Sequence, residues 1–459
     1  MKKIYQNIGK KSLRLLLYSL TPLLLISCDD FLDITPTGKV IAKTAAEYRA
    51  LLTYEYKTMP EDRGIATLRA DEMTLDKAST TAEDYNSFFD IWVWNDLAPQ
   101  ATTTSFGWRR YYHAIYIANY IIEHQNEIAE GTADELSQLV GEAYALRAYM
   151  HFLLVNLYAE PYTACTPTST RGIPVQTAPD VETIPNCSSV EAVYQQVISD
   201  LDEADKRLNV AKWDNGFNYR FTTIAARALR ARVALYKGDW QAARTAAESV
   251  IAQRPDLEDF TQKSSLLPDN YKSVESILAL EQVMTAVYKN IGRPSNDLLA
   301  IYKSGDQRKS KYFKQVTASV STLQKGGGGD SRCSFRTAEM YLIAAEAAAQ
   351  LGDTKAAATH LTTLMLKRYS ASTVAKYTEP LTTMTADELL AEIAHERRCE
   401  LAFEGHRWFD LRRTTRPLLT KTYDGQTYTL NADDSRYTLR FPVEAVEANP
   451  NLENWPIAN

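Results

Sequence analysis

Apolar residues recur at intervals of three and four along most of the chain, which is the spacing of one face of an α-helix. Several of these runs begin with a capping box, in which a Ser or Thr precedes the helix and a Glu three residues later completes the hydrogen bonding of the helix start. The boxes pair Thr44 with Glu47, Thr132 with Glu135, Ser188 with Glu191, and Thr385 with Glu388. The pattern therefore predicts a mainly α protein.

The expected helices cover residues 45–57, 105–129, 133–158, 189–208, 222–237, 239–253, 336–351, 353–369 and 386–404. Between them lie long stretches rich in Pro, Gly, Asn, Thr and aromatic residues, at 60–104, 159–187, 256–334 and 414–459. Irregular segments of this length in a compact protein are usually functional. We therefore expect a ligand site in these stretches rather than on the helices.

Two helix pairs look like copies of one unit. Ala231, Gly238 and Ala243 are spaced by seven and five residues, and Ala345, Gly352 and Ala357 repeat that spacing. In tetratricopeptide repeats such small residues let two antiparallel helices approach closely, and the glycine makes the turn. The spacing predicts a tetratricopeptide-like helix-pair scaffold. The alternative is two unrelated alanine-rich helix hairpins.

The stretch 385–413 is the densest in charge, and Arg397, Glu400 and Glu404 share a helical arc with apolar residues. Buried charges must be paired or neutralised. One interpretation is a metal site, because the run from His395 to Cys399 resembles the H-E-x-x-H zinc helix. Two adjacent arginines oppose a cation there, and the third ligand of the extended pattern would fall on a glycine. We favour a structural ion network, in which Arg397, with Arg407 as a further candidate, pairs with Glu400 and Glu404.

The first 27 residues carry five basic residues and no acid, followed by an apolar run from Leu15 to Ile26. This pattern predicts a cleaved secretory signal, too short to remain as a membrane span. It ends in Leu25-Ile26-Ser27-Cys28, which looks like a bacterial lipobox. We expect lipidation at Cys28, which would attach the protein to a membrane surface without a spanning segment. The alternative is an ordinary secretory signal with an incidental cysteine.

Loss of that basic segment would take the formal net charge from −6 to −11. An acidic chain without basic clusters is not expected to bind nucleic acid. Cys165 and Cys187 flank a Pro/Thr-rich stretch and could form a disulfide in an oxidising compartment, whereas Cys333 and Cys399 are expected to be buried and free.

Together, these features resemble those of the SusD/RagB family of outer-membrane nutrient-binding lipoproteins. The resemblance rests on ordered blocks, among them Gly141–Tyr149, Ala225–Trp240, Arg336–Leu342, Glu404–Arg412 and Phe441-Pro442. It implies one SusD-like domain over residues 28–459, with a loop-rich ligand-binding side at roughly 60–104 and 256–334. It also implies a cell-surface protein that captures oligosaccharide and delivers it to a SusC-like TonB-dependent transporter, with no catalysis, cofactor or metal. Some relatives bind peptides instead.

A sugar site needs a flat exposed aromatic ring and hydrogen-bonding side chains around it. The stretch from Tyr85 to Asp96 supplies both, and Trp108 follows it. We expect Trp92 or Trp94 to stack on the ligand, with Asn95 and Asp71 as hydrogen-bonding candidates. On an extended segment only one of those two tryptophans can face outward. The alternative is that both fill the core beneath the loops.

Segment 256–334 is a second source of ligand contacts, because family members commonly complete their site from this part of the chain. Tyr288 and Arg293 are the candidates there. Two other classes of function stay open: a surface glycosidase, which would need paired carboxylates, and an adaptor that binds only proteins through its helical repeats.

Overall fold

The computed structural model describes residues 42–76 and 81–452, so the expected signal segment and Cys28 lie outside it. Contacts divide the chain into two units, Met1–Lys43 and Thr44–Asn459. All described helices and strands lie in the second unit. Within its described residues, no helix combines the length and the apolar character that a membrane crossing requires.

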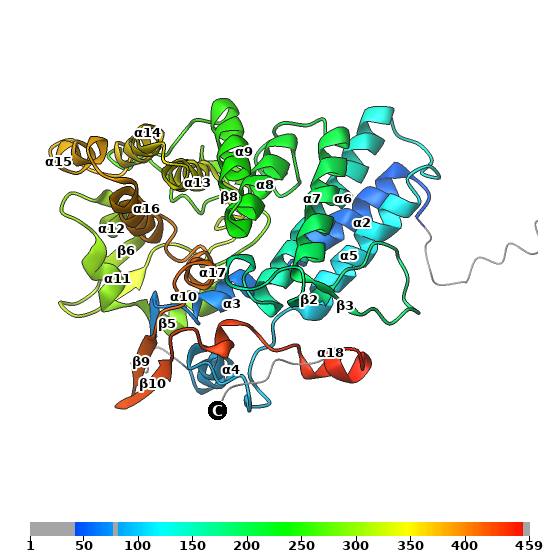
Figure 1. Ribbon diagram of the computed structural model, residues 1–459, viewed down its shortest axis with the longest axis horizontal. Coiled ribbons are helices and arrows are strands. Elements are labelled where there is room, and N and C mark those ends of the chain that lie inside the picture. Colours follow the sequence, from blue (N-terminus) through cyan, green and yellow to red (C-terminus); the bar gives the residue numbers. More distant parts are fainter. Residues whose placement is uncertain (1–41, 77–80, 453–459) are drawn as a thin grey trace, which may run out of the picture. The chain divides into compact units, whose positions relative to one another are not determined.

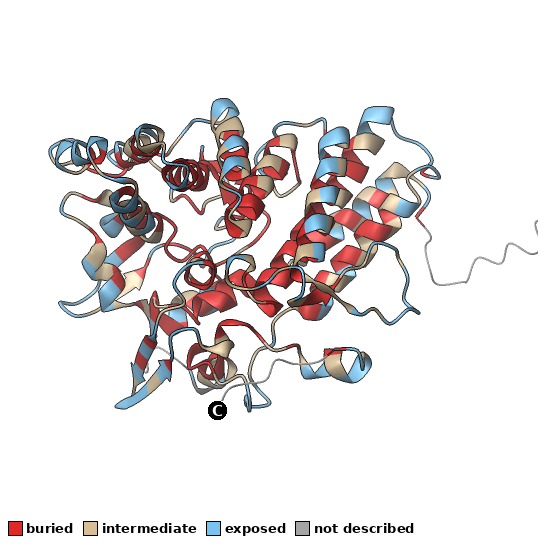
Figure 2. Cartoon of the chain, in the orientation of Figure 1, coloured by how far each residue is buried: buried red, intermediate tan, exposed pale blue. Residues whose placement is uncertain are grey.

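The N-terminal part of this unit is a group of packed helices (Figure 1). Its members are α2 (Ala45–Lys57), α5 (Trp108–Glu123), α6 (Ala133–Tyr158) and α7 (Val190–Arg207), whereas α3 (Asp62–Thr67) contacts the helix Arg407–Arg413 and α4 (Ala82–Trp92) contacts the helix Ala286–Ile291. The helix α6 packs against α2, α5 and α7. It is buried over nearly its whole length after the first turn, so it forms the axis of this group (Figure 2).

Three of the expected capping boxes are present, at Thr44, Thr132 and Thr385. The fourth prediction, that Ser188 caps a helix, is wrong by one residue. The cap of α7 is Ser189, whose hydroxyl accepts from the backbone of Ala192, while Ser188 lies in a short strand. Ser189 is the last residue of that strand, opposite Arg171, so the helix begins one residue later than the capping box predicts.

The predicted tetratricopeptide-like pairs are confirmed as α8 (Thr223–Lys237) with α9 (Trp240–Gln253), and α13 (Thr337–Gln350) with α14 (Thr354–Met365). Consecutive helices of this set contact one another, and α9 also packs on α13, so the two pairs stack. The alanines at 231, 243, 345 and 357 are fully buried at the close approaches. Gly238 and Gly352 both adopt the left-handed conformation that the turn requires.

Most of the remaining elements are short. They include the helices α10 (Ala286–Ile291), α11 (Asn296–Ile301), α12 (Gln307–Tyr312), α15 (Val374–Thr378), α16 (Ala386–Glu400), α17 (Arg407–Arg413) and α18 (Val443–Ala448). The 3₁₀ turns are η3 (Tyr162–Ala164), η4 (Pro380–Thr382) and η5 (Ser435–Tyr437). Of these, α16 is the longest, and it packs on α13 and α14.

The strands form two-stranded antiparallel ribbons. They pair β1 (Met73–Leu75) with β5 (Gly292–Pro294), β2 (Arg171–Pro174) with β3 (Cys187–Ser189), β4 (Ser276–Leu278) with β8 (Phe335–Arg336), β6 (Phe313–Gln315) with β7 (Ser321–Leu323), and β9 (Leu419–Tyr423) with β10 (Gln426–Leu430). The stretches expected to be irregular therefore contain most of the short helices and strands.

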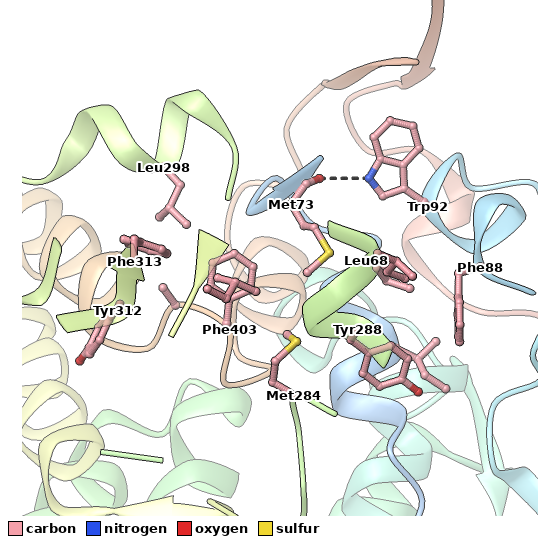
Figure 3. Packing of buried hydrophobic residues seen from close by; sticks show 14 of the residues in the cluster. Leu68, Met73, Phe88, Trp92, Met284, Tyr288, Leu298, Tyr312, Phe313 and Phe403 are labelled. Carbon is pink, nitrogen blue, oxygen red and sulfur yellow. Dashed lines mark hydrogen bonds between the residues drawn. The ribbon is translucent and has the colours of Figure 1, made fainter. Parts of the chain in front are cut away.

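Segments 60–104 and 256–334, which the sequence assigns to the ligand side, do pack together. The strand pair β1–β5 joins them, with Met73 opposite Pro294. A buried apolar cluster lies around this junction and includes Leu68, Trp92, Tyr288 and Phe313 (Figure 3). The part expected to be an extended tryptophan-rich loop is instead the helix α4, which begins at the Thr81 cap.

A network of buried ion pairs centres on the last turn of α16. The Glu400 carboxylate is fully buried. It accepts from Arg336 at 2.7 Å and from Arg368 at 2.8 and 2.9 Å, and Arg308 lies 3.3 Å away. Burial alone would raise the pKa of Glu400, but Arg368 and Arg336 outweigh it and hold the pKa well below its usual value.

The network extends in both directions along the chain. Glu396 pairs with Arg308 at 2.6 Å, and Glu404 pairs with Arg336 at 2.7 Å and with Lys325 at 2.5 Å. Glu275 also binds Arg336 and Arg368. Glu275, Arg308 and Lys325 belong to segment 256–334, Arg336 directly precedes α13 and Arg368 follows α14, so the network joins that segment to the ends of the second helix pair.

The predicted burial of Arg397, Glu400 and Glu404 is confirmed, but their predicted pairing is wrong. Arg397 pairs with Asp410 of α17 at 2.8 Å, and Arg407 pairs with Asp71 at the same distance. The helix α16 ends at Glu400, and Phe403 and Gly405 then take positive φ values. The prediction assumed one helix that continued through residue 404. Because the helix ends at Glu400, Arg397 and Glu404 do not share its face as predicted.

The described cysteines are all free thiols. Cys333 and Cys399 are buried, as expected, and Cys165 and Cys187 are half-buried. His395 lies 3.8 Å from the Cys399 sulfur, but Glu396 is occupied by Arg308 and by the Tyr369 hydroxyl. The charges of this helix therefore serve the ion network.

The substitution Glu400→Gln should lower the free energy of unfolding by about 3–5 kcal/mol, because it leaves buried arginines without their shared counter-charge. Urea denaturation measures the change. Asp387→Asn makes the same charge change on the exposed first turn of α16 and should cost under about 1 kcal/mol. Equal, small effects of the two substitutions would contradict the role of the network.

The pH dependence gives a check on the same prediction. A carboxylate with a lowered pKa stabilises the fold above the pKa of the unfolded chain and loses that effect as the pH falls through its folded value. The difference in free energy of unfolding between the natural protein and Glu400→Gln should therefore have its full size at pH 7. It should shrink at pH values well below 4.5, the ordinary Glu pKa. A gap that does not change with pH would contradict an ionised Glu400.

Candidate ligand-binding groove

A surface groove of about 720 Å³ opens where the end of α4 meets the segment after β10. One wall is formed by residues 89–97 and the other by residues 428–436. Leu97 on the rim is 64% exposed, so the groove is accessible to solvent. Two segments that lie far apart in the sequence thus line one groove.

The lining combines aromatic and polar groups. Phe89, Trp94 and Tyr428 supply aromatic atoms, and the rings of Phe89 and Tyr428 meet edge to face with centroids 5.5 Å apart. Amide, carboxylate and guanidinium groups come from Asn95, Asp96, Asn431, Asp433, Asp434 and Arg436. Such a mixture can hold the apolar face of a sugar ring and its hydroxyl groups together.

The buried side chain of Arg69 holds the two walls in register. Its two terminal nitrogens each donate to the Asp96 carboxylate at 2.7 Å, and one also donates to the backbone oxygen of Arg436 at 2.7 Å. The guanidinium lies over the Trp408 ring at 5.0 Å. A planar fork in contact with both walls should keep the groove from changing width.

The predicted ligand tryptophans are both in the core. Trp92 is fully buried and donates its indole N–H to the backbone oxygen of Met73 at 3.0 Å (Figure 3). Trp94 is 1% exposed and donates to the backbone oxygen of Arg69 at 2.9 Å. The prediction that one of them faces outward is wrong.

The reason lies in the backbone and in a buried lysine. Trp92 ends a helix, so alternation along an extended segment does not apply, and Trp94 adopts a left-handed φ of 60°. The ammonium of Lys421 lies 4.2 Å from the Trp94 ring centroid and 5.1 Å from that of Trp92. It donates to the backbone oxygens of Leu68 and Trp92. Burial lowers the pKa of Lys421 well below its usual value.

Asn95 does line the groove. It is half-buried, and its amide nitrogen donates to Asp90 at 2.9 Å and to the backbone oxygen of Ala98 at 3.0 Å. These bonds fix the amide at the mouth of the groove. Of the seven residues expected to contact a ligand, Asn95 is half-buried at the groove, and Trp94 forms part of the wall with only 1% of its surface exposed.

The other candidates lie elsewhere in the described unit. Asp71 is held by Arg407 and Arg398, Tyr288 is buried with its hydroxyl 3.2 Å from Glu61, and Arg293 pairs with Asp76 at 2.9 Å. Trp108 is 8% exposed and packs against Tyr112, Tyr158 and Phe441. The structure does not bring these four together with Asn95.

The carboxylates of the groove are already engaged. Asp96 pairs with Arg69, Asp434 with Arg436, and Asp433 with Arg416. Asp90 accepts from the Asn95 amide, the Gln100 backbone and the Thr103 hydroxyl. Partial burial would raise the pKa of Asp434, but hydrogen bonds from Arg436 outweigh it and hold the pKa below its usual value.

The contribution of residues 428–436 was missed from the sequence. A signal for it exists, because Asp424-Gly425 is a favoured two-residue hairpin loop and Thr/Tyr alternation flanks it. That signal predicts the β9–β10 hairpin that the structure contains. It does not predict which earlier segment the hairpin will face.

A second groove, of about 640 Å³, lies near the start of α2 and includes Arg49, Gln138, Asn209, Trp213 and Arg220. Trp213 is half-buried, and the Arg220 guanidinium covers its ring at 3.8 Å. Because that arginine already occupies the stacking position, the groove at residues 89–97 and 428–436 is the better candidate.

Two family models match the chain. One, described as starch-binding and associating with the outer membrane, matches residues 30–235, and the other, described as the SusD family, matches residues 177–459. SusD-like protein P38 of Formosa agariphila is 25% identical, with 87% of this chain and 91% of the relative covered. SusD-like protein P2 of the same organism is 23% identical, with 94% and 96% covered.

Solved structures share the fold at low identity. A SusD superfamily protein from Bacteroides thetaiotaomicron matches with a TM-score of 0.76 and 22% identity, over 90% of this chain and all of that one. A laminarin-binding SusD-like protein matches with a TM-score of 0.64 and 19% identity, over 90% and 99%. The SusD family model covers more than half of the sequence and the helical fold agrees with these neighbours, so the chain belongs to the SusD family.

Proposed function

We propose that this protein binds an oligosaccharide in the groove between residues 89–97 and 428–436 and delivers it, intact, to a SusC-like TonB-dependent transporter. The observation that carries the proposal is the lining itself, in which amide, carboxylate and guanidinium groups lie beside the half-buried aromatic side chain of Tyr428. Membership of the SusD family supports the same function. A peptide ligand is the alternative within the family.

The chemistry of the groove favours binding over hydrolysis. A glycosidase needs one carboxylic acid that stays protonated and a second carboxylate placed opposite it. The carboxylates of the groove are held as hydrogen-bond acceptors, and the pKa of Asp434 is lowered rather than raised. Glu400 lies in the charge-rich stretch 385–413, but its side chain is fully buried, so a substrate cannot reach it.

The proposal includes a lipid anchor at Cys28 and a position at the outer membrane. It rests on the basic and apolar leader, on the lipobox-like residues 25–28 and on the resemblance to surface lipoproteins. The acidic pair after Cys28 resembles the mark for surface export in some Gram-negative lipoproteins. Metabolic labelling with a fatty acid, compared between the natural chain and Cys28→Ala, distinguishes acylation from ordinary secretion.

Glucans are the first ligands to test, because one matching family model is described as starch-binding and one structural neighbour as laminarin-binding. Asn95→Ala and Asn431→Ala should each weaken binding about 2- to 10-fold, which is the effect of losing one or two hydrogen bonds at a neutral group. Titration calorimetry with laminarin and malto-oligosaccharides measures the change. Asn126→Ala removes an exposed amide outside the groove and serves as the matched control.

The result that would overturn the site is unchanged affinity in both groove variants together with loss of binding in Trp213→Ala. That outcome would place the ligand in the groove beside α2. Tight binding of peptides from a library, with no glucan binding, would show that the ligand is a peptide. Release of shorter sugars from a bound glucan would show that the protein is a hydrolase.

The buried tryptophans give a contrasting expectation. Trp92→Ala and Trp94→Ala should each lower the free energy of unfolding by about 3–5 kcal/mol, because each leaves a large cavity in the core. Trp240→Ala, at a half-buried position, should cost less. Denaturation curves read the difference. Loss of glucan binding at unchanged stability would instead show that an indole ring faces the ligand.

A further inference from the structure

A smaller pocket, of about 250 Å³, lies between the segment that precedes α8 and the end of α9. One wall is formed by residues 211–222, and the other by Arg254, Asp256 and residues 272–277. Asn218 joins the walls, because its amide nitrogen donates to the backbone oxygen of Tyr271 at 2.7 Å and to the Ser276 hydroxyl at 3.1 Å. The pocket shares no lining residue with the proposed glucan groove.

The lining of this pocket carries more positive than negative charge. Its cations are Lys212, Arg254 and Lys272, and its carboxylate is Asp256. Lys272 pairs with Asp330 at 3.2 Å, whereas Lys212 and Arg254 make no ion pair with any residue that the structure describes. In a chain whose formal net charge is −6, the pocket is therefore a local positive site, and its field attracts anions.

Arg254 is held in place without a counter-ion. It is half-buried at the end of α9, and its Nη2 donates to the backbone oxygens of Val274 and Ser276, both at 3.1 Å. Its Nε and Nη1 have no hydrogen-bond partner among the described residues, and neither belongs to the buried unpaired atoms there, so both are open to solvent. Burial lowers the pKa of Arg254, and Asp256 opposes that shift without cancelling it. The guanidinium stays charged and keeps two donors for an oxyanion.

Two exposed side chains add further donors to the pocket. Lys212 and Asn215 both belong to its lining, and neither side chain donates to a residue in the described ranges. Because both are exposed, a ligand can reach them without any opening of the fold. Together with Arg254, they can surround a group with several oxygens, such as a sulfate ester or a carboxylate.

Trp213 brings an aromatic ring to the same pocket. It is half-buried, and its indole N–H donates to the backbone oxygen of Phe221 at 3.3 Å. The Arg220 guanidinium covers the ring at 3.8 Å, but Arg220 lines the groove beside α2 and not this pocket. The part of the ring that reaches the pocket is therefore not the face that Arg220 covers. An indole beside oxyanion donors suits a sugar that carries an acidic group.

The size of the pocket limits the ligand. Its volume lies just below the range of about 300–1,000 Å³ that is typical of sites for drug-sized ligands, so it suits one sugar unit. We propose that the pocket binds an anionic sugar unit, whose sulfate ester or carboxylate lies against Lys212, Arg254 and Asn215 and whose ring contacts Trp213. Both acidic groups present the same chemistry, in which several oxygens share a negative charge. The pocket would let the protein bind acidic glycans independently of the groove for neutral glucans.

The test uses the purified protein and four probes: glucose 6-sulfate, glucuronate, glucose and methyl sulfate. Titration calorimetry at constant ionic strength should show saturable binding of an acidic sugar, with a Kd at least about tenfold below that of glucose. The comparison of glucose 6-sulfate with glucuronate identifies the acidic group that fits. Methyl sulfate has the same charged ester but no sugar ring, so it should bind more weakly than glucose 6-sulfate.

Arg254→Gln should raise the Kd for the acidic sugar about tenfold or more, because it removes a charged pair of donors. Lys212→Gln, at an exposed position, should raise it about 2- to 5-fold. Arg109→Gln makes the same charge change as Arg254→Gln on an exposed residue of α5 and should leave the Kd unchanged. Laminarin binding should not change in Arg254→Gln, so this site and the glucan groove are tested separately.

Three results would overturn the proposal. They are a Kd for the acidic sugars no lower than that for glucose, equal Kd values for methyl sulfate and glucose 6-sulfate, and unchanged acidic-sugar binding in both Arg254→Gln and Lys212→Gln. Should Arg254→Gln fail to fold, Lys212→Gln and the comparison of the four probes still decide.

Discussion

The shared pairing of the Glu400 carboxylate with Arg308, Arg336 and Arg368 is the interaction on which the rest of the structure depends. The three arginines come from segments that are far apart in the sequence, and none of them is exposed enough for water to replace its partner. Bringing such charges together costs desolvation, which good geometry repays only when every partner is present. The arrangement therefore specifies one way of docking segment 256–334 against α13 and α14. The tetratricopeptide-like pairs supply the surface on which segment 256–334 packs, and the ion network fixes the arrangement of that segment.

From this centre the chain leads directly to the proposed ligand groove. After α16, the helix α17 contributes Arg407 to Asp71, Trp408 to the face of Arg69, and Arg412 to the backbone oxygens of Tyr437 and Ala159. Arg69 in turn joins the two walls of the groove through Asp96 and Arg436. The charged motif at 385–413 is thus a support behind the site and not the site itself.

The helices were predictable because their signals are local: caps, apolar spacing, and small residues where two helices approach. The burial of Arg397, Glu400 and Glu404 was also predictable, since they lie among apolar residues. Their partners were not, because Arg336, Arg368 and Asp410 reach them only through long-range packing and because the helix ends at Glu400. In the groove, Asn95 was found by its polarity next to aromatic residues. Trp92 and Trp94 were misjudged because Trp92 ends a helix, Trp94 follows it with a left-handed backbone, and Lys421, more than 300 residues away, lies against both rings.

Hydrogen–deuterium exchange on the intact protein, with and without a saturating glucan chosen by calorimetry, tests the central claim most directly. The amides at the two walls of the groove come from separate parts of the chain, so only a ligand between them protects both. The account predicts slower exchange at residues 93–97 and 429–436, with the repeat helices α8, α9, α13 and α14 unchanged. Protection confined to residues 209–221 beside Trp213, or none at either wall at full occupancy, would contradict it.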